Sequence, residues 1–416
     1  MNQYVAMHDE FIPASEACEL LGISPATLYA YVSRGLLQSR PGPDHRSRVY
    51  RRTDVDKLVQ RKRAGRGAAR GAAQSLDRGL PVMETRISLI RPDGPWYRGH
   101  SAIAMVREGA SLEDAARLLW DCGNEDPFAQ PVVGTWPYAV APLAGDARLP
   151  PLERAMAAIP LLALDVRHSF NASPSVRREV AATLLRHNAA LLVGTTPGTA
   201  PVHTVLARQW KPRDARFAEV LRAALVLCAD HELNVSAFAA RVVASTGAHL
   251  HATVCTGLAA LSGPRHGGAT ARAHALIQDA LDAPSPARHI GERWARGEDL
   301  PGFGHALYPD GDPRGAELLR MLRESRGKDR AMQGIDALLK GAGESSGQHP
   351  NVDFALAAIC HVHGLPATPA LVLFAAGRLA GWLAHALEQQ ASGSLIRPRA
   401  RYTGLPPGNE IETPAS

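Results

Sequence analysis

Hydrophobic residues recur at helical spacing along most of the chain beyond residue 100. In residues 261–281, LSGPRHGGATARAHALIQDAL, the apolar positions that share one helical face are Ala273, Leu276, Ile277, Ala280 and Leu281. The same periodicity fills four other stretches, 111–122, 176–194, 216–231 and 368–390. These patterns predict a mainly α-helical protein with a bundle-like core.

Strand patterns are short and few. Residues 84–97, ETRISLIRPDGPWY, alternate apolar and polar side chains, which indicates a few short strands. Ala, Leu, Gly and Arg dominate the composition and runs of β-branched residues are sparse, so the composition also favours helix. Apolar residues make up 45% of the 416 residues, which is enough to bury a large core.

The N-terminal part of the chain has a pattern of its own. A helix is predicted from Ala14 or Ser15 up to Gly22, and a second helix from Ser24 as its N-cap. Two short helices joined by a few residues that include a glycine predict a helix-turn-helix.

A basic strand and a third helix follow this motif. The strand is predicted at 48–51, and the helix begins near Thr53. Residues beyond it are small and basic, which is typical of a linker. We therefore expect a winged helix-turn-helix domain at 1–63, a linker at 64–80 and a helical region at 81–416.

Charge is concentrated near this linker. Residues 40–70 contain eleven Lys and Arg and three Asp, a formal charge of +8, whereas the whole chain carries +6. A local basic block favours a polyanionic partner, or a solvated linker as the plain alternative.

Two N-terminal stretches, ASEACELLGISPATLYAYVSRGLL and RVYRRTDVDKL, resemble the MerR/excisionase type of winged DNA-binding domain. The resemblance implies a second helix in the major groove and a basic wing on phosphates. DNA is therefore a possible partner through residues 10–63, and a degenerate domain for protein contacts or an oligomerisation arm is the alternative. The implied contact residues are Thr27, Tyr29, Arg34, Arg46, Arg48, Arg51 and Arg52.

Several other classes of protein are disfavoured. The five cysteines are scattered without a CxxC motif, which indicates reduced thiols and no disulfide framework. No stretch of about 18 apolar residues lacks charge, so we expect no membrane span. The first residues contain no basic segment followed by an apolar run, so we expect a cytoplasmic protein. P-loop and GxGxxG motifs are also absent from the sequence, and no GxSxG elbow joins a predicted strand to a helix.

Polar side chains stand where predicted helices meet glycine turns. His266 lies between glycines at a helix start, His305 follows Gly302 and Gly304, and His231 ends a predicted helix. Two helix starts also carry charge: Asp312 is a predicted N-cap before Arg314, and Asp353 follows the predicted N-cap Asn351. A histidine at a helix N-terminus tends to stay neutral and to donate a hydrogen bond. Glycine lets a neighbour or a substrate approach the backbone closely.

Several stretches from residue 80 to residue 404 resemble the citrate synthase family, in order and at appropriate spacing. They are WYRGHSAIAMVREGASLEDAARLLW, DHELNVSAFAARVVASTGAHLHATVCTGLAALSGPRHGGA, PGFGHALYPDGDPR, NVDFALA, FAAGRLAGWLAHALEQ and IRPRARYTG. The resemblance implies a large and a small helical domain, with the small domain at roughly 230–345. It also implies an enzyme that condenses an acyl-CoA with a 2-oxo acid and hydrolyses the thioester.

The resemblance assigns roles to seven residues. Asp353 would be the base that removes the acyl α-proton, His266 would hydrogen-bond to the thioester oxygen, and His305 would polarise the ketone. Substrate carboxylates or the ketone would be bound by His231, Arg314, Arg378 and Arg397. Arg397 would reach the site of the other subunit, and Arg399 or Arg401 could replace it.

The implied substrates are acetyl-CoA or another short acyl-CoA, together with oxaloacetate, and no cofactor or metal is required. A 2-methylcitrate synthase that uses propionyl-CoA is the close alternative, because one methylene changes discrimination modestly. A transcription regulator that uses the synthase fold as a metabolite sensor is the alternative from another class. A homodimer or a higher homo-oligomer is expected.

Overall fold

The computed structural model describes residues 11–23, 28, 31–32, 37–42, 47–56, 83–132, 134–165, 173–400 and 402–404. The chain divides into two compact units, Met1–Glu84 and Thr85–Ser416, which are described separately below as unit 1 and unit 2. The finer boundaries that the sequence predicts, at residues 63 and 80 and around 230–345, stay predictions.

Unit 1 contains a three-stranded antiparallel sheet and a short helix. The strands are β1 (Phe11–Pro13), β2 (Ser39–Pro41) and β3 (Arg48–Arg51), with β3 in the centre, and the helix is α1 (Ala14–Leu21). Gly22 ends α1 in the left-handed conformation at φ 56°. The predicted strand at 48–51 and the predicted end of the first helix are confirmed.

A small apolar core holds unit 1 together. Its buried members include Ile12, Leu28, Tyr50 and Val55. Arg52 is tied to Glu16 by an ion pair of 2.9 Å. Some predicted DNA contacts lie outside the described residues, and these are Thr27, Tyr29, Arg34 and Arg46.

Unit 2 begins with a small sheet and continues as helices, which confirms the mainly α fold. The sheet is antiparallel, in the order β4 (Ser88–Arg91), β5 (Gly94–Tyr97) and β6 (His100–Ser101). A 3-10 turn lies at Ala163–Asp165. The helices are α4 (Ala102–Arg107), α5 (Leu112–Leu119), α6 (Ala141–Ala144), α7 (Pro151–Leu162), α8 (Pro174–Val193), α9 (Val202–Trp210), α10 (Ala215–Cys228), α11 (Val235–Ser245), α12 (Leu250–Leu261), α13 (Gly268–Asp282), α14 (Pro286–Ala295), α15 (Pro313–Arg326), α16 (Arg330–Ser346), α17 (Val352–Val362) and α18 (Thr368–Ser392).

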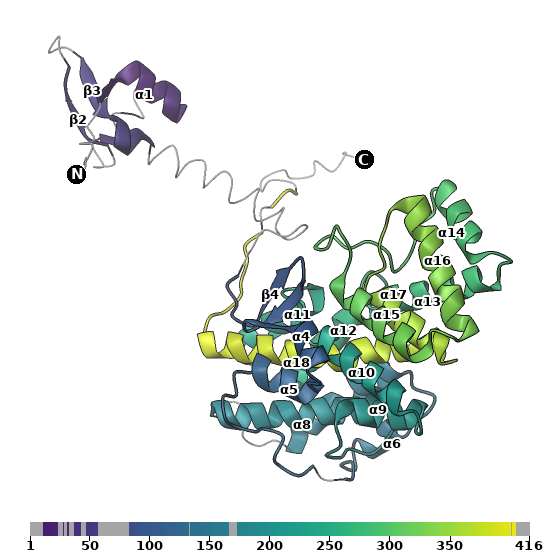
Figure 1. Cartoon of the computed structure of the whole chain (residues 1–416). Helices are drawn as coiled ribbons and strands as arrows, with labels where there is room; N and C mark the ends of the chain where they lie inside the picture. Colours follow the sequence, from purple (N-terminus) through teal and green to yellow (C-terminus); the bar gives the residue numbers. More distant parts are fainter. Residues whose placement is uncertain are drawn as a thin grey trace, which may run out of the picture. The chain divides into compact units, whose positions relative to one another are not determined.

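The longest helix, α18, is the centre of unit 2 (Figure 1). It packs against α5, α8, α10, α11, α12 and α17. Within the described part of the chain, it is the one helix long and apolar enough to cross a bilayer, but 89% of its apolar window is buried inside the protein. Its apolar surface is therefore covered by the other helices of unit 2.

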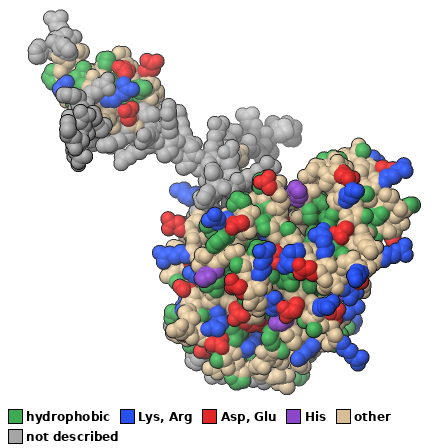
Figure 2. Space-filling view, viewed as in Figure 1, with side chains coloured by type: hydrophobic (Ala, Val, Ile, Leu, Met, Phe, Trp, Pro, Cys, Tyr) green, Lys and Arg blue, Asp and Glu red, His purple; other side chains and the backbone are tan. Residues whose placement is uncertain are grey.

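The visible face of unit 2 carries both signs of charge. Figure 2 shows Lys and Arg side chains interspersed with Asp and Glu, and scattered apolar side chains between them. This mixture agrees with the sequence, in which the basic excess lies within residues 40–70.

Candidate active site

Two loops that are distant in the chain pair with each other. Loop 302–304 joins loop 349–351 through two backbone hydrogen bonds, each 2.8 Å long, and an isolated β-bridge. His305 follows the first loop, and Asp353 lies in the first turn of α17 just after the second. The pairing therefore places His305 near the end of α17 that carries Asp353.

Gly302 is required at this junction for two reasons. Its φ of 87° is in the left-handed region that favours glycine. A Cβ atom on it would lie 2.9 Å from the Cβ of Phe354 and 3.0 Å from that of Ala273. The loop can approach α13 and α17 this closely only without a side chain.

His305, His231 and Tyr308 form a cluster beside this junction. The His231 and His305 rings meet edge to face with centroids 5.3 Å apart, and the His231 Nε2 lies 3.1 Å from the Tyr308 hydroxyl. The Nδ1 of His305 accepts a hydrogen bond from the Leu307 amide (3.1 Å), so a neutral ring carries its proton on Nε2. Burial, helped by the charge of Arg314, lowers the pKa of both His305 and His231. Both imidazoles are neutral at pH 7.

Arg314 is buried and already paired within the chain. Its Nε and Nη2 donate to the two carboxylate oxygens of Asp312, at 3.0 and 2.9 Å. One of these oxygens also accepts the amide of Val352 (2.9 Å), which links the starts of α15 and α17. Asp312 caps α15 as the sequence predicts. The Nε edge of Arg314 is therefore occupied, and a substrate carboxylate would have to use its Nη1 side.

His266 is held by a hydroxyl and an aromatic ring. Its Nε2 lies 2.8 Å from the Ser236 Oγ, and its ring meets the Phe374 ring edge to face at 5.7 Å. Burial first, and then the charge of Arg378, lower the pKa of His266 to about 4. The imidazole is thus neutral at pH 7, as expected, but burial is the main cause.

The glycine after His266 serves packing. A Cβ atom on Gly267 would overlap the carbonyl oxygen of Leu261 and lie 2.7 Å from the Leu371 Cδ1. We expected the glycines here to admit a substrate. At Gly267 the space is taken by the protein itself, because α12, α13 and α18 meet there.

Arg378 lies on α18 at the centre of these groups. Its Nε donates to the carbonyl of Cys228 at the end of α10 (2.8 Å), and its guanidinium stacks over the Phe374 ring at 4.7 Å. The opposite edge of the guanidinium, with Nη1 and Nη2, makes no hydrogen bond to any described residue. That edge has the geometry to accept a carboxylate in a bidentate manner.

The backbone of Asp353 is held by the cap of α17, while its carboxylate makes no hydrogen bond within the described part of the chain. Asn351 caps α17 and accepts the amides of Asp353 and Phe354, at 3.0 and 3.3 Å. No hydrogen bond joins its carboxylate to any residue that the structure describes. Burial raises the pKa of Asp353 to about 6, against the opposing charges of Arg314 and Arg378. A carboxylate with this pKa is a stronger base than an ordinary aspartate.

The charges of the two arginines connect these groups. Burial is the main influence on the pKa values of these groups, and Arg378 adds a further one. Its charge lowers the pKa of His231 and of His266, and it opposes the rise in the pKa of Asp353. Arg314 acts in the same way on His231, His305 and Asp353. Coulombic effects fall off with distance, so His231, His266, His305 and Asp353 each lie within electrostatic range of at least one of the two guanidinium groups. Six of the seven predicted residues therefore belong to one region of unit 2. The seventh, Arg397, is exposed beyond the end of α18.

The helix before His231 ends earlier than predicted. The pattern favoured a helix up to His231, but α10 ends at Cys228. The Tyr97 hydroxyl accepts the Asp230 amide (3.3 Å), which draws the backbone away from helical geometry. This hydrogen bond comes from 133 residues away, so the local pattern could not show it.

Three supporting side chains were not predicted from the sequence: Tyr308, Ser236 and Phe374. Tyr308 had a signal, because it stands three residues after His305 in the same loop. Ser236 and Phe374 had none, because each is an ordinary position on an apolar helix.

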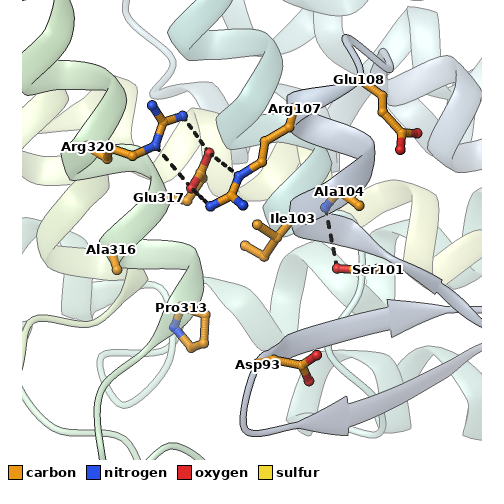
Figure 3. A pocket seen from close by; sticks show the side chains of 10 residues that line it. All are labelled: Asp93, Ser101, Ile103, Ala104, Arg107, Glu108, Pro313, Ala316, Glu317 and Arg320. Carbon is orange, nitrogen blue, oxygen red and sulfur yellow. Dashed lines mark hydrogen bonds and ion pairs between the residues drawn. The ribbon is translucent and has the colours of Figure 1, made fainter.

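A groove of about 670 Å³ lies between α4 and the first turns of α15, which line it with Pro313, Ala316, Glu317 and Arg320 (Figure 3). At one end, the buried carboxylate of Glu317 binds Arg107 of α4 and Arg320 of α15, at 2.8 and 2.7 Å. None of the seven predicted site residues lines this groove. The ion pairs fix α15, and with it Arg314, against α4.

Comparisons with known proteins agree with the fold and the motifs. The family model described as "Citrate synthase, C-terminal domain" matches residues 150–399. The family model described as "Helix-turn-helix domain" matches residues 14–63.

Curated relatives match this chain over less than half of its length. A citrate synthase of Haloferax volcanii is 41% identical over 193 residues, which cover 45% of this chain and 51% of that protein. A 2-methylcitrate synthase of Shewanella oneidensis is 37% identical over 204 residues, covering 48% and 54%. The chain thus spans about half the length of the curated relatives it matches.

Solved structures extend the likeness of the fold. A citrate synthase of Thermoplasma acidophilum, solved with carboxymethyl coenzyme A and oxaloacetate, has a TM-score of 0.66 at 22% identity and covers 82% of this chain and 98% of its own. The citrate synthase of Pyrobaculum aerophilum has a TM-score of 0.64 at 25% identity, covering 78% and 91%. Since the first family model matches 250 of the 416 residues, the chain belongs to the citrate synthase family.

Proposed function

We propose that this protein is an acyltransferase that condenses acetyl-CoA with oxaloacetate and hydrolyses the thioester to citrate and CoA. The observation that carries the proposal is the gathering of an unpaired carboxylate of raised pKa and neutral imidazoles around two buried guanidiniums. These groups suit the removal of a weakly acidic proton and the binding of a dicarboxylate.

The first step is enolisation of the acyl thioester. The carboxylate of Asp353 takes a proton from the α-carbon, and the electron pair moves onto the thioester oxygen. His266 stabilises that oxygen by donating a hydrogen bond. Its Nε2 faces Ser236, so the donor in this step is Nδ1–H, and Nε2 must then accept the proton of the Ser236 hydroxyl. That hydroxyl has one proton and donates it to the Asn234 Oδ1 (2.7 Å) in this structure, so the step requires it to turn from Asn234 to His266.

The second step forms the carbon–carbon bond. The enol carbon attacks the ketone carbon of the oxo acid, and His305 gives its Nε2 proton to the oxygen that becomes the alcohol. Arg378 binds a substrate carboxylate through its free edge, and Arg314 binds another through Nη1. Water then hydrolyses the thioester and releases CoA as a thiol.

Thiol release tests this function directly. With acetyl-CoA and oxaloacetate, we expect thiol to appear, with kcat/KM falling about tenfold per pH unit below pH 6 and level above it. The reason is that Asp353, with its pKa of about 6, must be deprotonated to accept a proton. No thiol with any short acyl-CoA would contradict the proposal, and a preference for propionyl-CoA would assign the 2-methylcitrate reaction instead.

The working unit in this proposal is a homodimer. The apolar side chains of Val235, Phe238 and Val242 share one face of α11, and Val235 is 70% exposed. A second copy of the chain would cover this face, and its exposed Arg397 would complete the site. Sedimentation at the assay concentration measures this association, and a fully active monomer would contradict it.

DNA binding by unit 1 is a second candidate function, favoured by the match to the helix-turn-helix family at residues 14–63. We expect the full chain to bind double-stranded DNA at low salt, with affinity falling steeply as salt rises, because Lys and Arg displace counterions from phosphates. Fluorescence anisotropy with a DNA library measures this. Loss of binding in the Arg48→Ala variant would assign the contact to β3, and no binding at low salt would reject the function.

A further inference from the structure

A buried carboxylate that the proposed mechanism does not use lies next to His231. Asp230 is 0% exposed and sits in the turn between α10 and α11. One of its oxygens, Oδ2, accepts the Ser88 hydroxyl and the amide of Glu232 (3.1 Å). The other, Oδ1, lies 3.3 Å from the His385 Nε2. Burying a charge is costly unless it is paired, so this position calls for a reason beyond packing.

The turn that holds His231 is strained. Glu232 has a φ of 54°, the left-handed conformation that is unfavourable for a residue with a side chain. Its amide points at Asp230 Oδ2 and also donates to the Ser88 Oγ (3.1 Å). The carboxylate therefore holds the residue after His231 in a conformation that it would otherwise leave.

His385 supports Asp230 from α18. It lies seven residues after Arg378, and therefore on the same helical face. Its Nδ1 is 3.4 Å from the Arg241 Nη1, which can only donate, so a neutral ring carries its proton on Nε2. That nitrogen is close to the Asp230 Oδ1 (3.3 Å), although the two atoms are not aligned as a hydrogen bond. Arg241 is held in turn by the Glu388 carboxylate at 2.7 Å.

The helix approaches Asp230 without a side chain in between. A Cβ atom on Gly381 would overlap the Asp230 Oδ1, and the Gly381 amide donates to the carbonyl of Ala229 (2.9 Å). The turn between α10 and α11 thus contacts α18 at Gly381, a position that lies between Arg378 and His385 in the helix.

Asp230 also supplies charge next to Arg378. Burial alone would raise the pKa of Asp230, but His385, Arg378 and Ser88 outweigh it and lower the pKa below the ordinary value. Burial lowers the pKa of Arg378, and Asp230 is the strongest opposing influence. The carboxylate therefore stays ionised and offsets the cost of burying the guanidinium.

We propose that Asp230 and His385 are positioning residues of the oxo-acid site: together they fix the His231 ring and balance the charge of Arg378. The inference rests on the proposed function, because it gives His231 and Arg378 a substrate to bind. It assigns a role to side chains that touch no reacting atom.

The test compares two substitutions at His385. His385→Leu removes the donor, whereas His385→Gln can place an amide N–H where Nε2 stands. We expect His385→Leu to raise the KM for oxaloacetate about tenfold or more, with the KM for acetyl-CoA within about twofold, and His385→Gln to restore most of the affinity. Asp230→Asn should have the same selective effect, and Ser88→Ala a weaker one.

A matched control separates positioning from stability. Glu113 is a half-buried carboxylate on α5 that accepts the amide of Val202 (2.8 Å). Glu113→Gln should leave both KM values unchanged, even if it lowers the melting temperature. The inference would be overturned if folded Ser88→Ala and His385→Leu proteins showed equal rises in both KM values. It would also be overturned if neither KM value changed in these proteins.

A direct measurement of oxaloacetate binding distinguishes the proposed function from the proposed role of Asp230 and His385. Calorimetry gives the dissociation constant of oxaloacetate without turnover. If the wild-type chain binds oxaloacetate but releases no thiol, the proposed function fails, and the inference stands only if His385→Leu weakens that binding about tenfold. If the wild type turns over and the variants bind oxaloacetate normally, the inference alone fails.

Discussion

Asp353→Asn lowers kcat by about 10²–10⁴-fold, the range that general-base catalysis contributes. The amide has the same shape as the carboxylate but cannot accept the α-proton. The affinity for oxaloacetate should stay within about threefold, because the proposed clamp is made by Arg314 and Arg378. Thiol release and calorimetry on the same protein preparation measure both quantities.

The same substitution should stabilise the fold at neutral pH. The pKa of Asp353 is raised in the folded chain, so the folded state binds this proton more tightly, and stability is lost as pH rises from about 4 to about 6. The Asn side chain does not ionise, so the variant does not lose this stability. We expect its free energy of unfolding at pH 7 to exceed that of the wild type by on the order of 1–3 kcal/mol. Asp279→Asn, an exposed position on α13, is the matched control and should change neither property. Full turnover by Asp353→Asn would remove Asp353 from the role of base.

Arg314→Met destabilises the protein by about 3–5 kcal/mol, the cost of leaving one partner of a buried ion pair alone. The carboxylate of Asp312 loses two hydrogen bonds from the Arg314 side chain but remains buried between α15 and α17. Urea unfolding at pH 7 measures the change. Catalysis should also fail, because the oxo acid loses one carboxylate partner.

The pH dependence identifies the cause of that loss. In the wild type, burial tends to raise the pKa of Asp312, but Arg314 outweighs it and the pKa is lowered, so the pair stabilises above about pH 4 and is lost on acidification. In the variant the guanidinium no longer opposes burial, and only the weaker influences such as the backbone amides of residues 314 and 352 remain, so the deficit should shrink as pH falls towards 4. The double variant Asp312→Asn/Arg314→Met should recover part of the stability. A deficit that is independent of pH would point to lost packing instead.

Helix periodicity and capping rules predicted much of the fold. Asp312 and Asn351 were predicted as N-caps from their positions before apolar runs, and both are. These signals are local, because a cap satisfies amides within its own first turn. The strand at 48–51 was predicted for the same kind of reason, from residues that adjoin in sequence.

The contacts that assemble the site could not be predicted in this way. The end of α10 at Cys228 depends on the Tyr97 hydroxyl, which lies 133 residues away in the chain. The pairing of Arg314 with Asp312 is local, but the burial of both side chains depends on the packing of α15 against α17. Motif resemblance named His266, His305 and Asp353, but periodicity alone did not connect them. Nor did it show that His266 is kept neutral mainly by burial.

The pairing of loop 302–304 with loop 349–351 has a consequence for how relatives of this chain can vary. The two ends of the intervening segment are pinned together, and the Asp312 contact with Val352 adds a third fastening. The later part of that segment consists of the C-terminal end of α15 and of α16. These helices project from the paired loops, and the chain then comes back to them. Residues can therefore be inserted or removed near its outer turn, at 327–329, while the separation of His305 and Asp353 is preserved.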